Sequence, residues 1–210
     1  TNTLVDLSLD NFKKSMLQIN YQKVSNDNYL KLFDLQSPLL LDDNSVLESK
    51  IQFDLEHESY DLTTSFEMYE TLSGSNSDRF QYVLPSYNFS KNFSLNNIDG
   101  SFNLNSYGNN TLNDTNVVAS SISNDLNYSA LNKFLDNGIK TNFEIALKNI
   151  NTIGKNNPTY KNSPQSELMS AYTYNASLPL IKKNSITFNT LEPKLSLRFS
   201  PHEMKNNNED

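Results

Sequence analysis

The residue types most often used in catalysis and metal binding are sparse in this sequence and poorly spaced for either task. Its two histidines, His57 and His202, each fall in a predicted turn or loop with no second metal ligand at a useful spacing. The chain has no cysteine, which excludes disulfides, thiolate metal sites and cysteine nucleophiles within it. No glycine-rich phosphate loop, serine nucleophile elbow or HExxH motif occurs. We therefore assign no catalytic, cofactor-binding or metal-binding residue and expect no enzyme activity; substrate-binding residues stay unassigned.

Carboxylates are more common, but their pattern is that of a strand surface. In "SVLESKIQFDLE" (45–56) and "YDLTTSFEMYE" (60–70), polar and apolar residues alternate with the two-residue period of a β-strand. The residues between them suit a tight hairpin turn. The predicted polar side holds Glu48, Lys50, Asp54, Asp61 and Glu67, and the predicted apolar side holds Leu47, Ile51, Phe53, Leu55, Leu62, Phe66 and Met68.

The same alternation recurs along the chain and predicts about ten antiparallel strands in an all-β meander. The other segments are 3–10, 15–24, 79–91, 99–107, 116–129, 137–150, 166–180 and 185–199. Residues 129–140 fit either a turn between strands or a short helix before Gly138, and we favour the turn. The last predicted strand contains Pro193, and its apolar residues change parity between Phe188 and Leu195, so we expect a break or slip at 191–193.

The predicted connections alternate in length. Long or medium ones are expected at 25–44, 71–78, 92–98, 108–115, 131–136 and 151–165, and short ones at 11–14, 57–58 and 181–184. Short turns at one end of a sheet and long loops at the other are typical of an outer-membrane β-barrel, whose strands alternate apolar-out and polar-in. Backbone groups at membrane depth are satisfied only in a closed barrel. We therefore expect this segment to be part of a large transmembrane barrel.

Composition agrees with a folded chain that has little soluble core. Hydrophobic residues make up only 36% of the 210 residues, and the mean hydropathy is -0.60. The 33 Asn residues indicate a composition bias, but the 11 Tyr and 12 Phe argue against disorder. A net charge of -7 without basic clusters argues against nucleic acid as a partner. The chain starts without Met and ends without a closing aromatic strand, so we expect the natural protein to extend beyond both ends.

Several patches resemble one protein family in a fixed order. "INYQKVSNDNYLKLFD" (19–34) and "RFQYVLPSYNFS" (79–90) are followed by "SELMSAYTYNASLPL" (166–180) and then by "FNTLEPKLSLRFSPHEMKN", which starts at Phe188. Together they resemble the LPS-assembly protein family, LptD, from residue 19 to 205. In this comparison Pro193 and Pro201 are family features of one mid-barrel strand. The tail after Pro201 is similar to the start of an extracellular loop.

The resemblance implies a place in the cell outer membrane and a role in Gram-negative envelope biogenesis. Family members deliver lipopolysaccharide to the outer leaflet, hold a lipoprotein plug (LptE-like) in the barrel, and receive lipid from periplasmic bridge proteins. No cofactor is implied. The family's periplasmic jelly-roll domain, its first and last barrel strands and its cysteines have no counterpart in 1–210. No gate or lipid-channel residue can therefore be assigned to a position in this sequence.

Two other interpretations stay open. The chain could be part of another large outer-membrane barrel, such as a porin or a siderophore-type transporter, or it could be a soluble β-rich adhesin-like domain. The ordered patches favour the LPS-assembly family over the other barrels. The predicted loop pattern and the lack of a hydrophobic core favour either barrel over the soluble domain.

Overall fold

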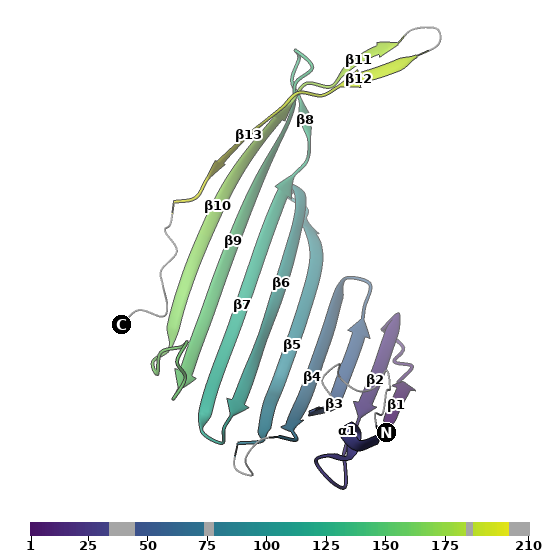
Figure 1. The fold of residues 1–210 in the computed structure, drawn as a ribbon. Coiled ribbons are helices and arrows are strands. Elements are labelled where there is room, and N and C mark those ends of the chain that lie inside the picture. The colour runs from purple at the N-terminus through teal and green to yellow at the C-terminus, as the bar shows by residue number, and fades with distance from the viewer. Residues whose placement is uncertain (34–44, 74–77, 184–186, 202–210) are drawn as a thin grey trace.

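The computed structural model describes residues 1–33, 45–73, 78–183 and 187–201. Within these ranges every regular element is a β-strand except one short helix, α1 (Tyr29–Phe33). Figure 1 shows a single broad sheet whose long strands lie side by side and twist across its width. The predicted all-β antiparallel meander is confirmed.

Ten strands form the meander, in the order β1-β2-β3-β4-β5-β6-β7-β9-β10-β13. Their bounds are β1 Asn2–Asp6, β2 Lys14–Asn20, β3 Val46–Glu56, β4 Tyr60–Thr71, β5 Phe80–Leu95, β6 Ile98–Asn113, β7 Val117–Ala130, β9 Lys140–Lys155, β10 Gln165–Ser177 and β13 Lys194–Phe199. The two-residue β8 (Lys133–Phe134) pairs only with β9. Within the described residues β1 and β13 are free edges, so the sheet is not closed.

The β3–β4 hairpin follows directly from its alternation. Ile51 pairs with Phe66 and Leu55 with Leu62, so the predicted apolar residues of both strands share one face of the sheet. The backbone N–H of His57 donates to the carbonyl of Tyr60 at 2.8 Å and closes the turn. A slip of one residue would turn every one of these side chains to the other face, so the apolar pattern fixes the register.

A bulge in β5 keeps its aromatic residues on that same face. Tyr82 pairs with Met68, whereas Tyr87 pairs with Thr64, although 82 and 87 differ in parity. The register shifts between these pairs, where Pro85 has no N–H to donate to the ladder. The irregular Leu-Pro step therefore places the aromatic side chains of both halves of the strand on the same face of the sheet.

The predicted alternation of loop lengths holds only in the first half of the sheet. We call the end of the sheet next to α1 the helix end and the opposite end the hairpin end. Connections at the helix end are 21–45, 72–79, 114–116 and 156–164, and those at the hairpin end are 7–13, 57–59, 96–97, 131–139 and 178–193. The predicted long loop at 108–115 is wrong, because β6 continues to Asn113 and only three residues turn into β7. Pairing with strands on both sides holds this Asn-rich stretch in extended conformation.

The predicted short turn at 181–184 is also wrong. Residues 178–193 form the longest insertion at the hairpin end and contain their own hairpin, β11 (Leu180–Lys183) and β12 (Phe188–Leu191). Figure 1 shows this hairpin projecting beyond the main sheet. The expected interruption at 191–193 is present, but it separates two strands of different sheets and is not a slip within one strand.

The connection at 131–139 contains β8 and a turn closed by the N–H of Gly138, which donates to the carbonyl of Leu135, so the predicted turn is confirmed and no helix forms there. The helix lies instead in the long β2–β3 connection. Leu30 of α1 packs with Leu47 and Leu72 in a small buried cluster, against which Val24 also packs. Leu47, on the apolar face of β3, is consequently only 2% exposed.

Candidate functional site

Cross-strand pairing divides the side chains of the sheet into two faces of opposite chemistry. We call one the apolar face: Leu17, Ile19, Ile51, Phe53, Leu55, Leu62, Phe66, Met68, Tyr82, Phe89, Phe93, Phe102, Leu104, Leu126, Tyr128, Phe143, Ile145, Leu147, Tyr172, Tyr174, Leu195, Leu197 and Phe199. We call the other the polar face: Lys50, Gln52, Asp54, Thr63, Ser65, Glu67, Asn88, Asn103, Asn105, Asn127, Glu144, Lys148, Thr173, Asn175, Ser196 and Arg198.

On the polar face of β3 and β4, two of the carboxylates singled out in the sequence, Asp54 and Glu67, accept hydrogen bonds from neighbouring polar side chains. Glu67 accepts hydrogen bonds from the hydroxyls of Ser65 at 2.7 Å and Tyr69 at 2.8 Å, and lies 3.6 Å from the Lys50 ammonium. Asp54 accepts from the Gln52 amide at 2.8 Å and from the Thr63 hydroxyl at 3.0 Å. These contacts use the carboxylate oxygens to order a polar wall, and they bring no nucleophile or general base together.

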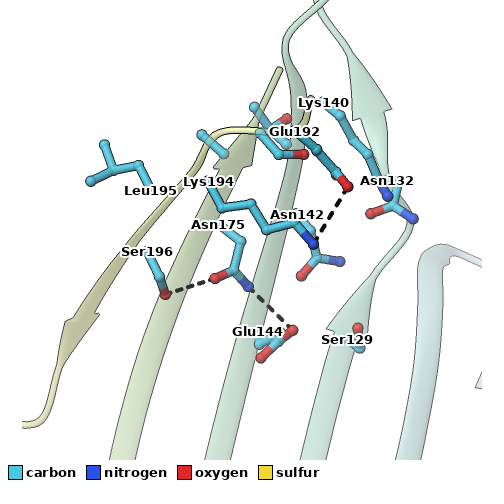
Figure 2. Close-up of a pocket in the computed structure, with 13 residues that line it drawn as sticks. Ser129, Asn132, Lys140, Asn142, Glu144, Asn175, Glu192, Lys194, Leu195 and Ser196 are labelled. Carbon is cyan, nitrogen blue, oxygen red and sulfur yellow. Dashed lines mark hydrogen bonds and ion pairs between the residues drawn. The ribbon is translucent and has the colours of Figure 1, made fainter. Parts of the chain in front are cut away.

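The polar face has an open recess of about 430 Å³ near the hairpin end. It lies between β7, β9, β10 and β13, and Figure 2 shows Asn142, Glu144 and Asn175 among its lining side chains. The Asn175 amide donates to Glu144 at 3.3 Å and accepts from the Ser196 hydroxyl at 2.7 Å. The sequence pattern does not reveal this recess, because its lining residues come together only through the register of four strands.

The rim of the recess carries an ion pair from the connection before β13. The ammonium of Lys194 lies 3.5 Å from the Glu192 carboxylate, an interaction drawn in Figure 2. A hydrogen bond from Ser177, with the nearby charge of Lys194, lowers the pKa of Glu192. Both partners are solvent-accessible, so the pair orders the rim rather than stabilising the fold.

A second recess of about 350 Å³ continues along the polar face and shares Ser129 and Glu144 with the first. Arg198, Thr173 and Asn103 are among its lining residues. The joined groove mixes amides, hydroxyls and charges of both signs. That chemistry suits water and hydrated polar groups, and it does not by itself select one ligand.

Neither histidine takes part in a metal site that the structure describes. The ring of His57 stacks on Tyr60 at 4.6 Å, and its Nδ1 accepts the backbone N–H of Ser59 at 3.2 Å. His202 lies outside the described residues. Within 1–33, 45–73, 78–183 and 187–201, no group of three His, Cys, Asp or Glu side chains is placed to hold a metal ion.

On the apolar face, the position of the apolar stretch changes from strand to strand. In β3 the apolar stretch is centred on Phe53. Following the paired residues from Phe53 across the sheet, which we call a pairing row, leads to Asn151 in β9 by way of Thr64, Tyr87, Gly108 and Ile122. In β9 the stretch is centred on Ile145, six residues closer to the hairpin end than Asn151. The apolar band therefore crosses the strands obliquely.

Comparison with protein-family models and with curated proteins finds no match for this chain. Among the described residues, no helix is long and apolar enough to span a membrane.

Proposed function

We propose that this chain forms part of the wall of a large outer-membrane β-barrel, and that the barrel belongs to the translocon that assembles lipopolysaccharide at the cell surface. In this proposal the apolar face contacts lipid and the polar face lines a hydrated lumen. The wall guides lipopolysaccharide and catalyses no reaction. The proposed partners are lipopolysaccharide, a lipoprotein plug of the LptE type, the periplasmic bridge proteins and outer-membrane lipid.

The observation that carries the membrane assignment is the large uncovered apolar face. Ile51, Phe66 and Phe143 are each more than one-third exposed, and within the described residues the only buried hydrophobic cluster is the small one at α1. A soluble protein rarely leaves a contiguous apolar surface of this kind open to water. In a membrane this exposure is favourable, because the apolar face contacts lipid and not water.

The oblique apolar band agrees quantitatively with a membrane barrel. Six residues over the five strand steps from β3 to β9 is about 1.2 residues per strand, or roughly 4 Å at ~3.3 Å per residue. With strands ~4.8 Å apart, a band perpendicular to the barrel axis requires a strand tilt of about 40°. Transmembrane β-strands tilt by about 35–45°.

The free edges support a larger closed structure. The outer edges of β1 and β13 carry backbone N–H and C=O groups that the described residues leave without a partner strand. In lipid each unsatisfied group costs several kcal/mol, so both edges need further strands. Ten strands with two open edges are then one arc of a barrel with a higher strand number.

The assignment to lipopolysaccharide assembly rests on the sequence patches in their order. Two of the patches coincide with irregularities of the sheet: the Leu84-Pro85 step with the β5 bulge, and Leu191 to Lys194 with the break between β12 and β13. Irregular strand positions are the parts of a barrel wall that alternation alone does not specify. Their agreement with the ordered patches favours the LPS-assembly family over porins and siderophore-type transporters.

Cysteine labelling tests the two faces. In the full-length protein folded in lipid, Lys50→Cys should react with a water-soluble maleimide, whereas Ile51→Cys, one residue away on the lipid side, should be protected. The reverse result would show that the apolar face lines the lumen and the polar face contacts lipid. Equal, rapid labelling of both would replace the barrel with a soluble domain.

Depletion of the protein in its own cell tests the lipopolysaccharide assignment. We expect increased sensitivity to large hydrophobic antibiotics and lipopolysaccharide retained at the inner membrane or in the periplasm. If depletion slowed only the uptake of one nutrient, the transporter interpretation would replace this one.

A further inference from the structure

On the apolar face, a row of amides and hydroxyls runs across β5, β6, β7, β9 and β10. We call these residues the amide ladder: Tyr87, Ser106, Asn124, Asn149 and Ser166. The Tyr87 and Ser106 hydroxyls are 3.1 Å apart, and Ser106 donates to Asn124 Oδ1 at 2.7 Å. Asn124 Nδ2 lies 3.5 Å from Asn149 Oδ1, and Asn149 Nδ2 lies 3.3 Å from the Ser166 hydroxyl.

The ladder separates two parts of the apolar face. On its hairpin side, β9 presents Leu147, Ile145 and Phe143 in succession. On its helix side, polar and apolar residues mix, with Asn151 beside Ile122 and Ser120 beside Ile153. Leu168, in the same pairing row as Asn149, is the one large apolar residue at ladder level on β10, and Asn149 bonds past it to Ser166 and to the carbonyl of Glu167.

The apolar part of β9 is nearly as tall as the apolar band of an outer-membrane barrel. It is bounded by Thr141 and Asn149, eight residues apart, which at ~3.3 Å per residue is roughly 26 Å along the strand. Tilted by about 40°, this gives a band roughly 20 Å tall, close to the ~25 Å apolar band of outer-membrane barrels. The corresponding stretch of β3, from Ser49 to His57, has the same length.

We infer that the amide ladder marks where the hydrocarbon core of the bilayer ends on the helix side of β6, β7, β9 and β10. Its amides lie at the level of lipid headgroups and water, and the helix-side ends of these strands stand outside the membrane. This inference rests on the proposed membrane wall. It explains why a lipid-facing surface carries a row of polar side chains: they satisfy one another across the strands, and their outer side meets hydrated headgroups.

The inference predicts different environments for two residues of one pairing row. Phe53 and Ile122 lie on the same face and in the same row, but Phe53 is central in its apolar stretch while Ile122 lies on the helix side of the ladder. Phe53 should contact acyl chains and Ile122 should contact headgroups and water. A band that followed the pairing rows would place both at equal depth.

Tryptophan fluorescence distinguishes these cases, since residues 1–210 contain no Trp and add no emission of their own. The variants Phe53→Trp, Ile122→Trp and Ile145→Trp, made in the full-length protein, are folded into phosphatidylcholine vesicles whose lipids carry bromine near the middle of the acyl chains. The unsubstituted protein supplies the background, and heat-modifiable migration on a gel confirms folding. We expect Phe53→Trp and Ile145→Trp to lose emission in brominated vesicles, and Ile122→Trp to keep it and be quenched by aqueous iodide.

Two other results would overturn the inference in different ways. If Ile122→Trp loses as much emission as Phe53→Trp, the ladder is not the boundary, although the membrane wall stands. If all three variants keep their emission in brominated vesicles, the apolar face does not meet lipid and the proposed wall fails with it. Should Ile122→Trp not fold, Ile153→Trp, on the helix side of the ladder in β9, gives the same comparison with Ile145→Trp in one strand.

Discussion

The two long insertions of this sheet lie at opposite corners, and one packs against the sheet whereas the other projects from it. At the helix end, the β2–β3 connection folds back, and Leu30 of α1 buries Leu47 and Leu72. At the hairpin end, β11 and β12 project outward, with Ile181, Phe188 and Leu191 each about two-thirds exposed. The first insertion is held by contacts within the chain, whereas the described strands of the second pair with each other and not with the main sheet. A long insertion can therefore be part of the wall or an appendage to it.

Ion pairs also hold the insertion that carries α1 against the sheet. Arg79, just before β5, donates to Asp27 at 2.9 Å and lies 2.7 Å from Glu70. The hydrogen bond with Asp27 raises the pKa of Arg79, and an arginine side chain is charged in proteins in any case. One guanidinium thus ties the loop before α1 to β4. The described residues of the β11–β12 hairpin have no comparable link to the main sheet.

Among the point substitutions that test this comparison, truncating Leu47 should cause the largest loss of unfolding free energy. Leu47→Ala opens a cavity beneath α1, and such changes at buried leucines cost about 2–5 kcal/mol of unfolding free energy. The matched control is Ile51→Ala, on the same strand and face but 43% exposed, for which we expect roughly 1 kcal/mol. Urea unfolding of the full-length protein in lipid measures both. Equal losses would mean that α1 does not cover Leu47 in the membrane.

Changing Arg79 should release the helix corner while leaving the sheet intact. In Arg79→Met both carboxylates lose their partner, so we expect proteinase K to cleave the 21–45 connection several times faster. Arg79→Lys keeps the charge but cannot form the forked contact. Its cleavage rate should lie between those of the unsubstituted protein and Arg79→Met. The difference from the unsubstituted protein should shrink at high salt, because screening already weakens the pairing there. Unchanged cleavage of Arg79→Met would show that packing alone holds the corner.

The same contrast explains what the sequence could and could not predict. Alternation predicts the β3–β4 hairpin, because the side-chain period of Ile51, Phe53 and Leu55 is itself the property that places them on one face. It fails for Gly108 to Asn113, where Asn and Gly resemble a loop although pairing with β5 and β7 makes a strand. Local composition cannot report neighbours that lie elsewhere in the chain.

The candidate site depends still more on long-range register. Glu144 and Asn175 are 31 residues apart and meet because Asn175 pairs with Asn142 in the β9–β10 ladder. That register is set by the connection at 156–164, whose geometry includes a left-handed Asn156 at φ 54°. The groove on the polar face could therefore not be located from the residue types that line it. Alternation does not separate the β11–β12 hairpin from the main sheet, because its four-residue strands continue the pattern of their longer neighbours.

Deleting the β11–β12 hairpin should have the smallest effect and gives the sharpest contrast with α1. Ser177 pairs with Lys194 at the base of the insertion, so Asn-Gly can replace residues 178–193 and connect β10 to β13 as a two-residue hairpin turn. The main sheet loses no buried side chain by this change. We expect its unfolding free energy to stay within about 0.5 kcal/mol, as for surface changes away from packed features.

Deleting residues 24–44 with α1 is the matched experiment at the other corner, and it should destabilise the sheet because Leu47 and Leu72 lose their cover. If the hairpin deletion proved equally costly, the exposed side chains of Ile181, Phe188 and Leu191 would have to be buried against another molecule in the folded protein. The double variant Ile181→Ser, Phe188→Ser separates the remaining possibilities, because it keeps the backbone of the hairpin. It should match the unsubstituted protein if the hairpin is a free appendage, and reproduce the loss if a partner packs on those two side chains.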